Sequence, residues 1–415
     1  MPFTSVSAGA PSVFVDSQSA LTDAYATLST TPGGGTIYLT GNYSADAEIH
    51  LNGGGSNSVH ITSANPNDAV EISRIYLNNV DNVRVSNMHV DGSGVDRPDF
   101  HRDLDLQSSS RIEIADSVFS SNGSIMFDPS GVGVLGERLG MIRNSEDITV
   151  EGNYFERYEQ GLTVQETSNF HFANNEVTLM QGDGLRLVGV EDVLVEDNYF
   201  HDFAATPNEF THSDFIQLWS SNAITESRDI TVTGNVLDTG NGVSVQGIWM
   251  RNEQNDHGNP EYVYENITVT NNLIYTGSAN GIGIGVANNV LVEGNTLLWN
   301  QDAVTIKADG DTSYFPRIRL DEDITNGRVA RNITTRILHG PGTVLEDNIL
   351  ISWRPERANF AGTHFPDIIG GGDIGPAGGL QLSATSPFVG IGADASQPGA
   401  ALPVSRPPPP EPVPN

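Results

Sequence analysis

Residues 148–155 read ITVEGNYF, and nearly the same pattern returns at 193–200 as VLVEDNYF. Apolar and polar residues alternate, an Asn follows, and a short apolar pair closes the stretch. Similar segments stand at 83–90, 170–177, 230–237, 267–274, 290–297 and 344–350. The gaps between the recurring Asn residues are 22, 23, 37, 37 and 23 from Asn153 to Asn295. The full series is Asn87, Asn153, Asn175, Asn198, Asn235, Asn272, Asn295 and Asn348.

A period near 22 residues, built from short β-branched alternations between Gly, Asn and Asp turns, is typical of a parallel β-helix. One period forms one coil, and successive coils stack about 4.8 Å apart. We expect each Asn inside a turn, with its amide bonded to the backbone along the stack. The sequence therefore predicts an all-β fold: a single-stranded right-handed parallel β-helix of about 10–12 coils with an N-terminal cap.

A second series of strands precedes the Asn series and should form another continuous sheet. Alternate side chains of a strand point to opposite faces, so one set should enter the core and the other should face outward. We expect these strands at 103–107, 131–135, 161–165, 184–188, 214–219, 247–251, 281–285 and 303–307. The inward side chains would be Leu162, Leu185, Leu187, Ile216, Leu218, Ile248, Met250, Val304 and Ile306.

Three segments are predicted along the chain. Residues 1–58 contain an amphipathic stretch that predicts a short helix followed by first strands, and these would cap the open end of the solenoid. Residues 59–400 would form the parallel β-helix. Residues 401–415, rich in Pro, are predicted to form a disordered linker.

Composition excludes several classes of function. The 415 residues contain 52 Asp and Glu against 20 Lys and Arg, so the formal net charge is −32 and cysteine is absent. Such a charge repels nucleic acid and anionic membranes, and no apolar run is long enough to span a bilayer. Without cysteine there is no disulfide, thiolate chemistry or zinc–thiolate site. We expect a monomer with no nucleic-acid or membrane partner.

The stretches ALTDAYATL, GGGTIYLTGNY, VHITSANP and SPFVGIGA, together with the Asn repeats, resemble the right-handed β-helix enzymes of the pectate-lyase-like superfamily. That superfamily includes lyases and hydrolases of uronate polysaccharides and mannuronan C-5-epimerases. The resemblance covers the chain up to about residue 400 and implies a polysaccharide substrate. Together with the absence of cysteine, the strong acidity and the Pro-rich C-terminal stretch, it favours a secreted, extracellular bacterial enzyme. We expect no required cofactor, with calcium as the metal to consider.

The candidate site lies where the repeat is interrupted. Both 37-residue gaps carry insertions, which we expect to rise as loops from one side of consecutive coils, where loops on a rigid scaffold often build binding sites. They flank the outward residues of the second strand series, which combine amides, Trp side chains and cations that suit an anionic sugar chain. The predicted substrate-binding residues are Gln165, Gln217, Trp219, Trp249 and Arg251.

Elimination at a uronate needs a cation that neutralises the carboxylate, a base that takes the neighbouring proton, and an acid for the leaving oxygen. The first task suits Arg186, Gln217, Arg251 and Lys307. His212 is the candidate base with Asp214 orienting its ring, and Lys307 is the alternative base if burial lowers its pKa. We therefore expect a polysaccharide lyase.

Three alternatives remain open. Asp183 and Asp214 begin consecutive strands and could form the carboxylate pair of a glycoside hydrolase, although the paired-Asp and Gly-His-Gly motifs of polygalacturonase-like enzymes are absent. An epimerase would need a Tyr and a His where Ile125 and Ser130 stand. A tailspike- or adhesin-type β-helix would bind glycans without cutting them.

The sequence leaves the metal unassigned. Calcium takes six to eight oxygen ligands, and two acidic clusters could supply some of them: Asp309 with Asp311, and Asp321 with Glu322 and Asp323.

Overall fold

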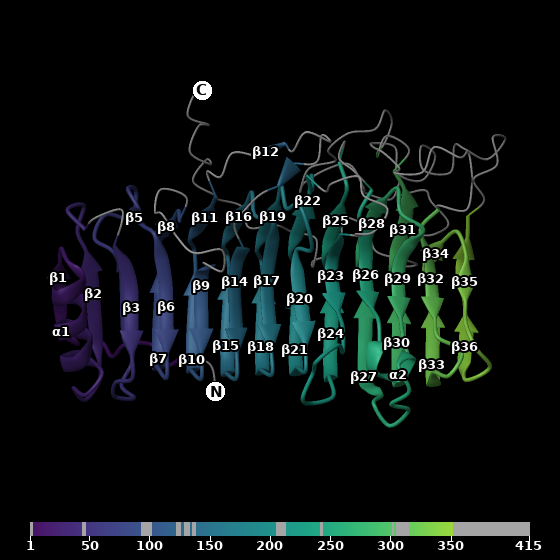
Figure 1. The fold of residues 1–415 in the computed structure, drawn as a ribbon, viewed down its shortest axis with the longest axis horizontal. Helices are drawn as coiled ribbons and strands as arrows, with labels where there is room; N and C mark the ends of the chain where they lie inside the picture. The colour runs from purple at the N-terminus through teal and green to yellow at the C-terminus, as the bar shows by residue number, and fades with distance from the viewer. Residues whose placement is uncertain are drawn as a thin grey trace.

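The computed structural model shows a straight solenoid in which three parallel sheets run along one axis (Figure 1). It describes residues 3–43, 47–92, 102–121, 126–127, 133–134, 138–204, 213–240, 244–300, 303 and 315–351. Each coil passes from sheet A through sheet C to sheet B and then returns to sheet A. The predicted parallel β-helix is confirmed.

Sheet A holds the strands that carry the Asn-ending repeats. Its 13 strands are parallel, and each pairs with the strands before and after it in chain order. They are β1 (Ser12–Val15), β2 (Gly35–Leu39), β4 (Val59–Ser63), β7 (Asp81–Ser86), β10 (Ser110–Ala115), β15 (Glu146–Glu151), β18 (Ser168–Ala173), β21 (Glu191–Glu196), β24 (Arg228–Thr233), β27 (Tyr264–Thr270), β30 (Ala287–Glu293), β33 (Thr325–Ala330) and β36 (Thr343–Glu346).

Sheet C holds the short strands that follow the Asn turn. Its 11 strands are β5 (Val70–Ile72), β8 (Met88–Val90), β11 (Val118–Ser120), β16 (Tyr154–Glu156), β19 (Glu176–Thr178), β22 (Tyr199–His201), β25 (Val236–Asp238), β28 (Leu273–Thr276), β31 (Thr296–Trp299), β34 (Ile333–Thr334) and β37 (Ile349–Leu350).

Sheet B corresponds to the second predicted strand series. Its 11 strands are β3 (Glu48–Asn52), β6 (Arg74–Asn78), β9 (Arg102–Gln107), β14 (Arg138–Arg143), β17 (Gln160–Gln165), β20 (Leu185–Val188), β23 (Asp214–Leu218), β26 (Gln246–Met250), β29 (Asn280–Ile284), β32 (Arg317–Leu320) and β35 (Ile337–Leu338).

Two predicted members of sheet B are wrong. The strand between β9 and β17 is β14, not residues 131–135; within that segment, β13 (Gly133–Val134) pairs antiparallel with β12 (Met126–Phe127). The strand after β29 is β32, not residues 303–307. In both cases the strand in sheet B contains two arginines, because only the inward residues of a strand need to be apolar.

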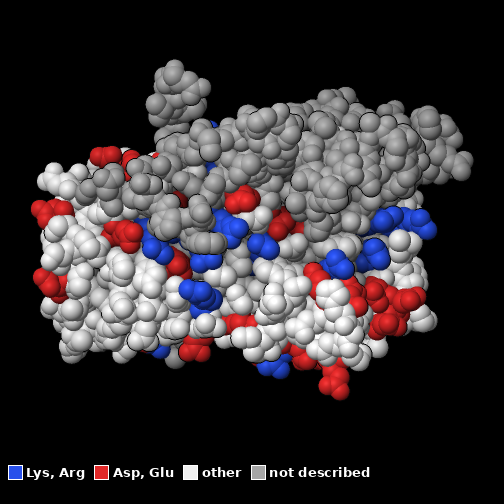
Figure 2. Space-filling view, in the orientation of Figure 1, with Lys and Arg blue, Asp and Glu red and all other residues white. Residues whose placement is uncertain are grey.

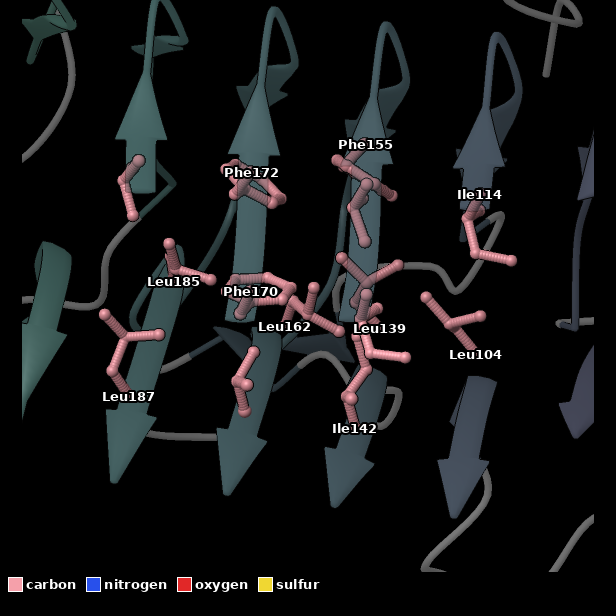
Figure 3. Close-up of a cluster of buried hydrophobic side chains, with 14 of the residues drawn as sticks. Leu104, Ile114, Leu139, Ile142, Phe155, Leu162, Phe170, Phe172, Leu185 and Leu187 are labelled. Carbon is pink, nitrogen blue, oxygen red and sulfur yellow. The ribbon is translucent and has the colours of Figure 1, made fainter. Parts of the chain in front are cut away.

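The core lies between the three sheets, where the inward residues of successive coils stack. Figure 3 shows Leu162, Leu185 and Leu187 pointing inward together with Phe155 and Phe172. All of them are almost fully buried. The other predicted inward residues of β23 and β26 are buried too, whereas Val304 and Ile306 lie outside the described residues.

The Asn ladder occupies the tight turn between sheets A and C. Asn175 is fully buried; its Nδ2 donates to the carbonyl of Val150 at 2.9 Å, and its Oδ1 accepts the backbone N–H of Asn153 at 3.0 Å. Equivalent bonds link every coil from Asn153 to Asn348, with Asn332 between Asn295 and Asn348. The ladder thus satisfies buried backbone groups that no strand can reach.

The ladder corrects one prediction and adds one member. Asn87 is not part of it: the register places Met88 opposite the ladder position, and Asn87 instead holds the neighbouring positive-φ position, at φ 55, like Gly152 at φ 65. Asn tolerates this conformation better than most residues. The repeat at 83–90 is therefore in register with 148–155, but its ladder position is Met88, one residue after Asn87; Asn332 is a ladder member that the predicted series lacks.

The N-terminal end is covered by α1 (Gln18–Leu28), as predicted. Ser17 caps the helix by accepting the N–H of Ala20, and Leu21, Tyr25 and Leu28 are buried against the first coils. The division into a cap over 1–58, a solenoid over 59–400 and a linker over 401–415 stays a prediction. The last of these segments lies outside the described residues.

Candidate functional site on the outward face of sheet B

The outward side chains of sheet B form columns that run along the solenoid. Arg186 on β20 is the register partner of Gln217 on β23, and Gln217 is the partner of Trp249 on β26. Gln165, the last residue of β17, begins the adjacent column. Trp219, directly after β23, and Arg251, directly after β26, continue this column. The register thus brings the predicted binding residues onto one face.

Two carboxylates stand at the starts of neighbouring strands. The backbone N–H of Asp214 donates to Oδ1 of Asp183 at 2.9 Å, and Oδ2 of Asp214 accepts a 2.8 Å hydrogen bond from Nε2 of Gln217. The side chain of Asp183 is 9% exposed, and Asp214 is fully buried. Burial of two acids this close requires compensating donors.

Arg186 supplies a positive charge to this pair. Its Nε lies 3.2 Å from Oδ2 of Asp183, and its guanidinium carbon lies 4.3 Å from the centroid of the Trp219 ring. Burial lowers the pKa of Arg186 below its ordinary value; Asp183 and Asp214 oppose this effect, and the positive charge of Arg138 adds to it. The guanidinium is therefore held between acids and an aromatic face, in an arrangement that restrains its orientation.

Trp249 and Arg251 differ in how firmly they are placed. The Trp249 ring covers Gly283 on the next strand, where an added Cβ would lie 2.1 Å from Cζ3 of the indole. Arg251 is exposed, and its Nε contacts Asp256 of α2 (Glu253–Asp256) at 2.9 Å. The glycine makes room for the Trp249 ring, whereas Arg251 points toward the neighbouring loop.

Two predicted residues are not placed with the site. His212 and Lys307 lie outside the described residues. The strand position expected for Lys307 belongs to β32, whose Arg319 continues the Trp249–Gly283 column. The roles of His212 and Lys307 as bases stay predictions.

Arginines that the sequence pattern did not single out extend the site. Sheet B carries or directly adjoins nine of the 20 basic residues of the chain. Figure 2 shows basic side chains gathered across this face. The alternations in 102–107, 138–143 and 317–320 could have revealed most of them. The nine are Arg74, Arg102, Arg138, Arg143, Arg186, Arg251, Arg317, Arg319 and Arg336.

Two of the three insertions lie together in the structure. Residues 204–212 connect sheet C to β23, whereas 219–227 and 251–263 follow the opposite ends of β23 and β26. The latter two pack together, with the Tyr262 hydroxyl donating to the carbonyl of Thr225 at 2.7 Å, and they line a cavity of about 490 Å³. Residues 205–212 lie outside the described residues, so the expectation of a common side stays a prediction for the first insertion.

A second polar group lies on sheet C. His201 sits between two carboxylates, with Nε2 3.0 Å from Glu176 and Nδ1 2.8 Å from Asp202, and its ring stacks on Tyr199 at 4.1 Å. Tyr158 is fully buried and donates to Asp103 at 2.8 Å. His201 and Tyr158 are thus each held by hydrogen bonds to carboxylates.

Among the residues that the structure describes, no group of three or more His, Asp or Glu side chains is arranged to hold a metal ion. Asp309 and Asp311 lie outside those residues. Calcium binding stays a prediction. No helix in the described part of the chain has the length and apolar character to cross a membrane.

Three stacked parallel sheets joined through an Asn-lined turn define a parallel β-helix protein with a polar site on one sheet. The chain belongs to the right-handed β-helix family, whose model, "Right handed beta helix region", matches residues 73–315. No curated protein sequence matches the chain significantly.

The solved structures to which the chain is similar include enzymes and an adhesin. DFA-IIIase from Arthrobacter chlorophenolicus A6, in complex with DFA-III, is 13% identical with a TM-score of 0.46, over 83% of this chain and 95% of that one. PfbA, a surface adhesin of Streptococcus pneumoniae, is 13% identical with a TM-score of 0.46, over 80% and 87%. A mannuronic acid specific polysaccharide family 6 lyase from human gut microbiota is 13% identical with a TM-score of 0.41, over 84% and 89%. At this distance the likeness concerns the fold alone.

Proposed function

We propose that the protein is an extracellular polysaccharide-degrading enzyme, a lyase that cleaves uronate-containing chains by β-elimination on the outward face of sheet B. The observation that carries this proposal is the group formed by Arg186, Asp183, Asp214 and Gln217 beside the Trp219 ring. In a chain of net charge −32, nine of the 20 basic residues gather on this sheet. An acidic sugar chain is the ligand that such a face would attract.

Each group has a chemical task in an elimination. Arg186 is restrained by Asp183 and Trp219, so its guanidinium can pair with a uronate carboxylate and favour loss of the neighbouring proton. Gln217 would add an amide hydrogen bond, and the rings of Trp219 and Trp249 would stack on sugar faces. His212 is the proposed base, with Lys307 as the alternative.

A glycoside hydrolase is the second candidate because the structure brings Asp183 and Asp214 together, with the Asp214 N–H 2.9 Å from the Asp183 carboxylate. Hydrolysis needs two carboxyl groups on either side of one bond. Against this assignment, Asp214 is fully buried and already accepts from Gln217.

The test follows two products at once on a panel of acidic and neutral polysaccharides: the ultraviolet absorbance of unsaturated uronate and new reducing ends. Elimination raises both signals. Reducing ends without absorbance would replace the lyase by the hydrolase. Neither signal across the panel would contradict both enzymes and favour an epimerase or a binding protein of adhesin type.

The Arg186→Gln variant tests the role of the guanidinium. We expect kcat/KM to fall by about 10²–10³, because the uronate carboxylate loses its counter-charge in the transition state. Arg186→Lys should restore only part of the rate, since Lys lacks the planar fork. Arg228→Gln, an exposed position at the start of β24 in sheet A, is the matched control for charge. Unchanged kinetics in Arg186→Gln would remove Arg186 from the mechanism.

A further inference from the structure

Two groups of arginines flank the central residues of sheet B. The N-terminal arginine group consists of Arg102, Arg138 and Arg143, on β9 and β14. The C-terminal arginine group consists of Arg317 and Arg319 on β32, with Arg336 directly before β35. Figure 2 shows basic side chains in two separate groups on this face, in line with the strands that Figure 1 labels.

The N-terminal group lies on two paired strands of sheet B. Arg102 and Arg138 are cross-strand partners at the starts of β9 and β14, and Arg143 lies at the other end of β14, where its partners are Gln107 and Gln165. Among the described residues, neither Arg102 nor Arg143 makes an ion pair with a carboxylate, and the Arg138 Nε lies 3.7 Å from Glu159 in a half-exposed pair. Three guanidinium groups thus share a surface with little compensating charge.

The pKa of Arg102 reflects the interaction between these positive charges. Burial lowers this pKa below its ordinary value; Asp105 opposes the effect, and the charges of Arg143, Arg138 and Arg74 add to it. Like charges held together on a half-buried surface repel one another. A bound anion would relieve that repulsion and accept hydrogen bonds from the guanidinium groups.

The C-terminal group repeats the arrangement. Burial lowers the pKa of Arg317, and the charges of Arg319 and Arg336 lower it further. In the described part of the chain, none of the three forms an ion pair with a carboxylate. The protein contains 52 acidic residues, yet in the described structure few of them pair with these two arginine groups. Both groups can therefore bind an anion from outside the protein.

The distance between the groups determines the kind of ligand. Six strand intervals separate β14 from β32, by way of β17, β20, β23, β26 and β29. At about 4.8 Å per interval, this distance is roughly 29 Å. A small anion can occupy one group only, whereas a chain with repeated acidic groups can reach both and cross the residues around Arg186.

We propose that sheet B is a track for a long polyanionic polysaccharide lying along the solenoid axis, held at both ends by the two arginine groups while Arg186 contacts its middle. This inference rests on the proposed function for the central site. It adds that the preferred substrate is a polymer with closely repeated carboxylate or sulfate groups, and that short fragments bind weakly.

Binding without turnover tests the track. Retardation of the protein in native gels that contain polygalacturonate, dextran sulfate or neutral dextran gives an apparent Kd for each polymer. The variants are Arg102→Gln/Arg143→Gln and Arg319→Gln/Arg336→Gln. The control is Arg228→Gln/Arg331→Gln, an exposed pair on or beside sheet A; every pair removes two positive charges, from −32 to −34.

We expect each sheet B pair to weaken polyanion binding roughly tenfold, and the control to change it less than about twofold, because a long-range charge effect would act on all three alike. Retardation by dextran should be absent. Comparison of polygalacturonate with dextran sulfate decides between carboxylate and sulfate. Added salt should weaken wild-type binding more steeply than that of the variants.

Equal retardation of all three pairs, or equal retention by dextran, would overturn the track. Thermal unfolding of each variant verifies that it folds. The track and the proposed function can fail separately. If the sheet B pairs lose polymer binding while the wild type cleaves no polymer, the track is retained and the enzyme is rejected. If both sheet B pairs cleave the polymer and a uronate trisaccharide as fast as the wild type does, the enzyme is retained and the track is rejected.

Discussion

At the scale of the residue, Asn235 shows how one amide connects three coils. Its Nδ2 donates to the carbonyl of Val195 at 3.0 Å, and its Oδ1 accepts from the Asn198 amide at 2.9 Å. Its own N–H donates to Oδ1 of Asn272 at 3.0 Å, and the side chain is fully buried. Local sequence predicts an Asn there, because a tight turn leaves backbone groups without strand partners.

We expect Asn235→Ala to lower the free energy of unfolding by about 3 kcal/mol, because several buried groups lose their partners at once. Denaturation by urea measures the change. Asn288→Ala is the control: its amide donates to Glu265 on the exposed surface, and we expect a loss below about 0.5 kcal/mol. Equal losses in the two variants would show that the ladder adds nothing beyond surface hydrogen bonds.

His60 gives the fold a dependence on pH. Its Nε2 lies 2.8 Å from the Ser86 hydroxyl, and burial, followed by the charge of Arg84, lowers its pKa from 6.5 to about 4. Above the unfolded value the imidazole is neutral in both states. Between pH 6.5 and pH 4, His60 is protonated in the unfolded chain but neutral in the folded chain. The free energy of unfolding therefore decreases as the pH falls through this range.

We therefore expect the free energy of unfolding to decrease less in His60→Gln than in the wild type when the pH is lowered from 7.5 to 5. Protonation of carboxylates changes the stability of both proteins equally, so the difference between them reports His60. Urea titrations at several pH values measure the difference between the two proteins. Parallel curves over this range would contradict the role of His60.

At the scale of the element, β26 and β29 show how one strand positions the side chain of another. Trp249 and Gly283 are register partners, and the indole occupies the space that a side chain at 283 would need. Gly283→Ala should turn the indole away from the face, because the new Cβ would lie 2.1 Å from its Cζ3. We expect tryptophan fluorescence to become more accessible to acrylamide and the affinity for polysaccharide to fall several-fold.

The change in quenching should disappear when Trp249 is replaced by Phe, since the chain has only four Trp residues and the others remain. Gly41→Ala, where an added Cβ meets no atom within 4 Å, controls for the substitution itself. If quenching in Gly283→Ala equals that of the wild type, the glycine does not position the ring.

Elements also mark the limit of prediction from sequence. The stretches GVGVL and AVTIK contain fewer charged residues than RLGMIR and RIRL, yet sheet B uses the latter two as β14 and β32. A strand with one outward face needs only its inward residues to be apolar, and Leu139, Ile142, Ile318 and Leu320 supply them. The outward arginines obscure the pattern although they do not disturb the packing.

At the scale of the whole molecule, a net charge of −32 repels itself in the folded state. Raising the ionic strength from about 0.05 to about 0.5 M shortens the Debye length from roughly 14 to 4 Å. We expect Tm to rise by a few degrees with sodium chloride. Calcium chloride at equal ionic strength is the matched comparison, and a larger rise at low concentration would reveal a specific calcium site. A Tm that falls with salt would contradict dominant self-repulsion.

The sequence by itself determined the coil, its inward apolar residues and the Asn in its tight turn, because each coil contacts mainly its neighbours and the same solution is repeated along the chain. It also placed Arg186, Gln217 and Trp249 on one face, since alternation alone decides inward and outward. Only the tertiary structure decided which segments pair as neighbouring strands, and so placed Arg102, Arg138 and Arg143 on the adjacent strands β9 and β14. That pairing follows from the connections between sheets C and B, whose lengths vary from coil to coil and leave no periodic signal in the sequence.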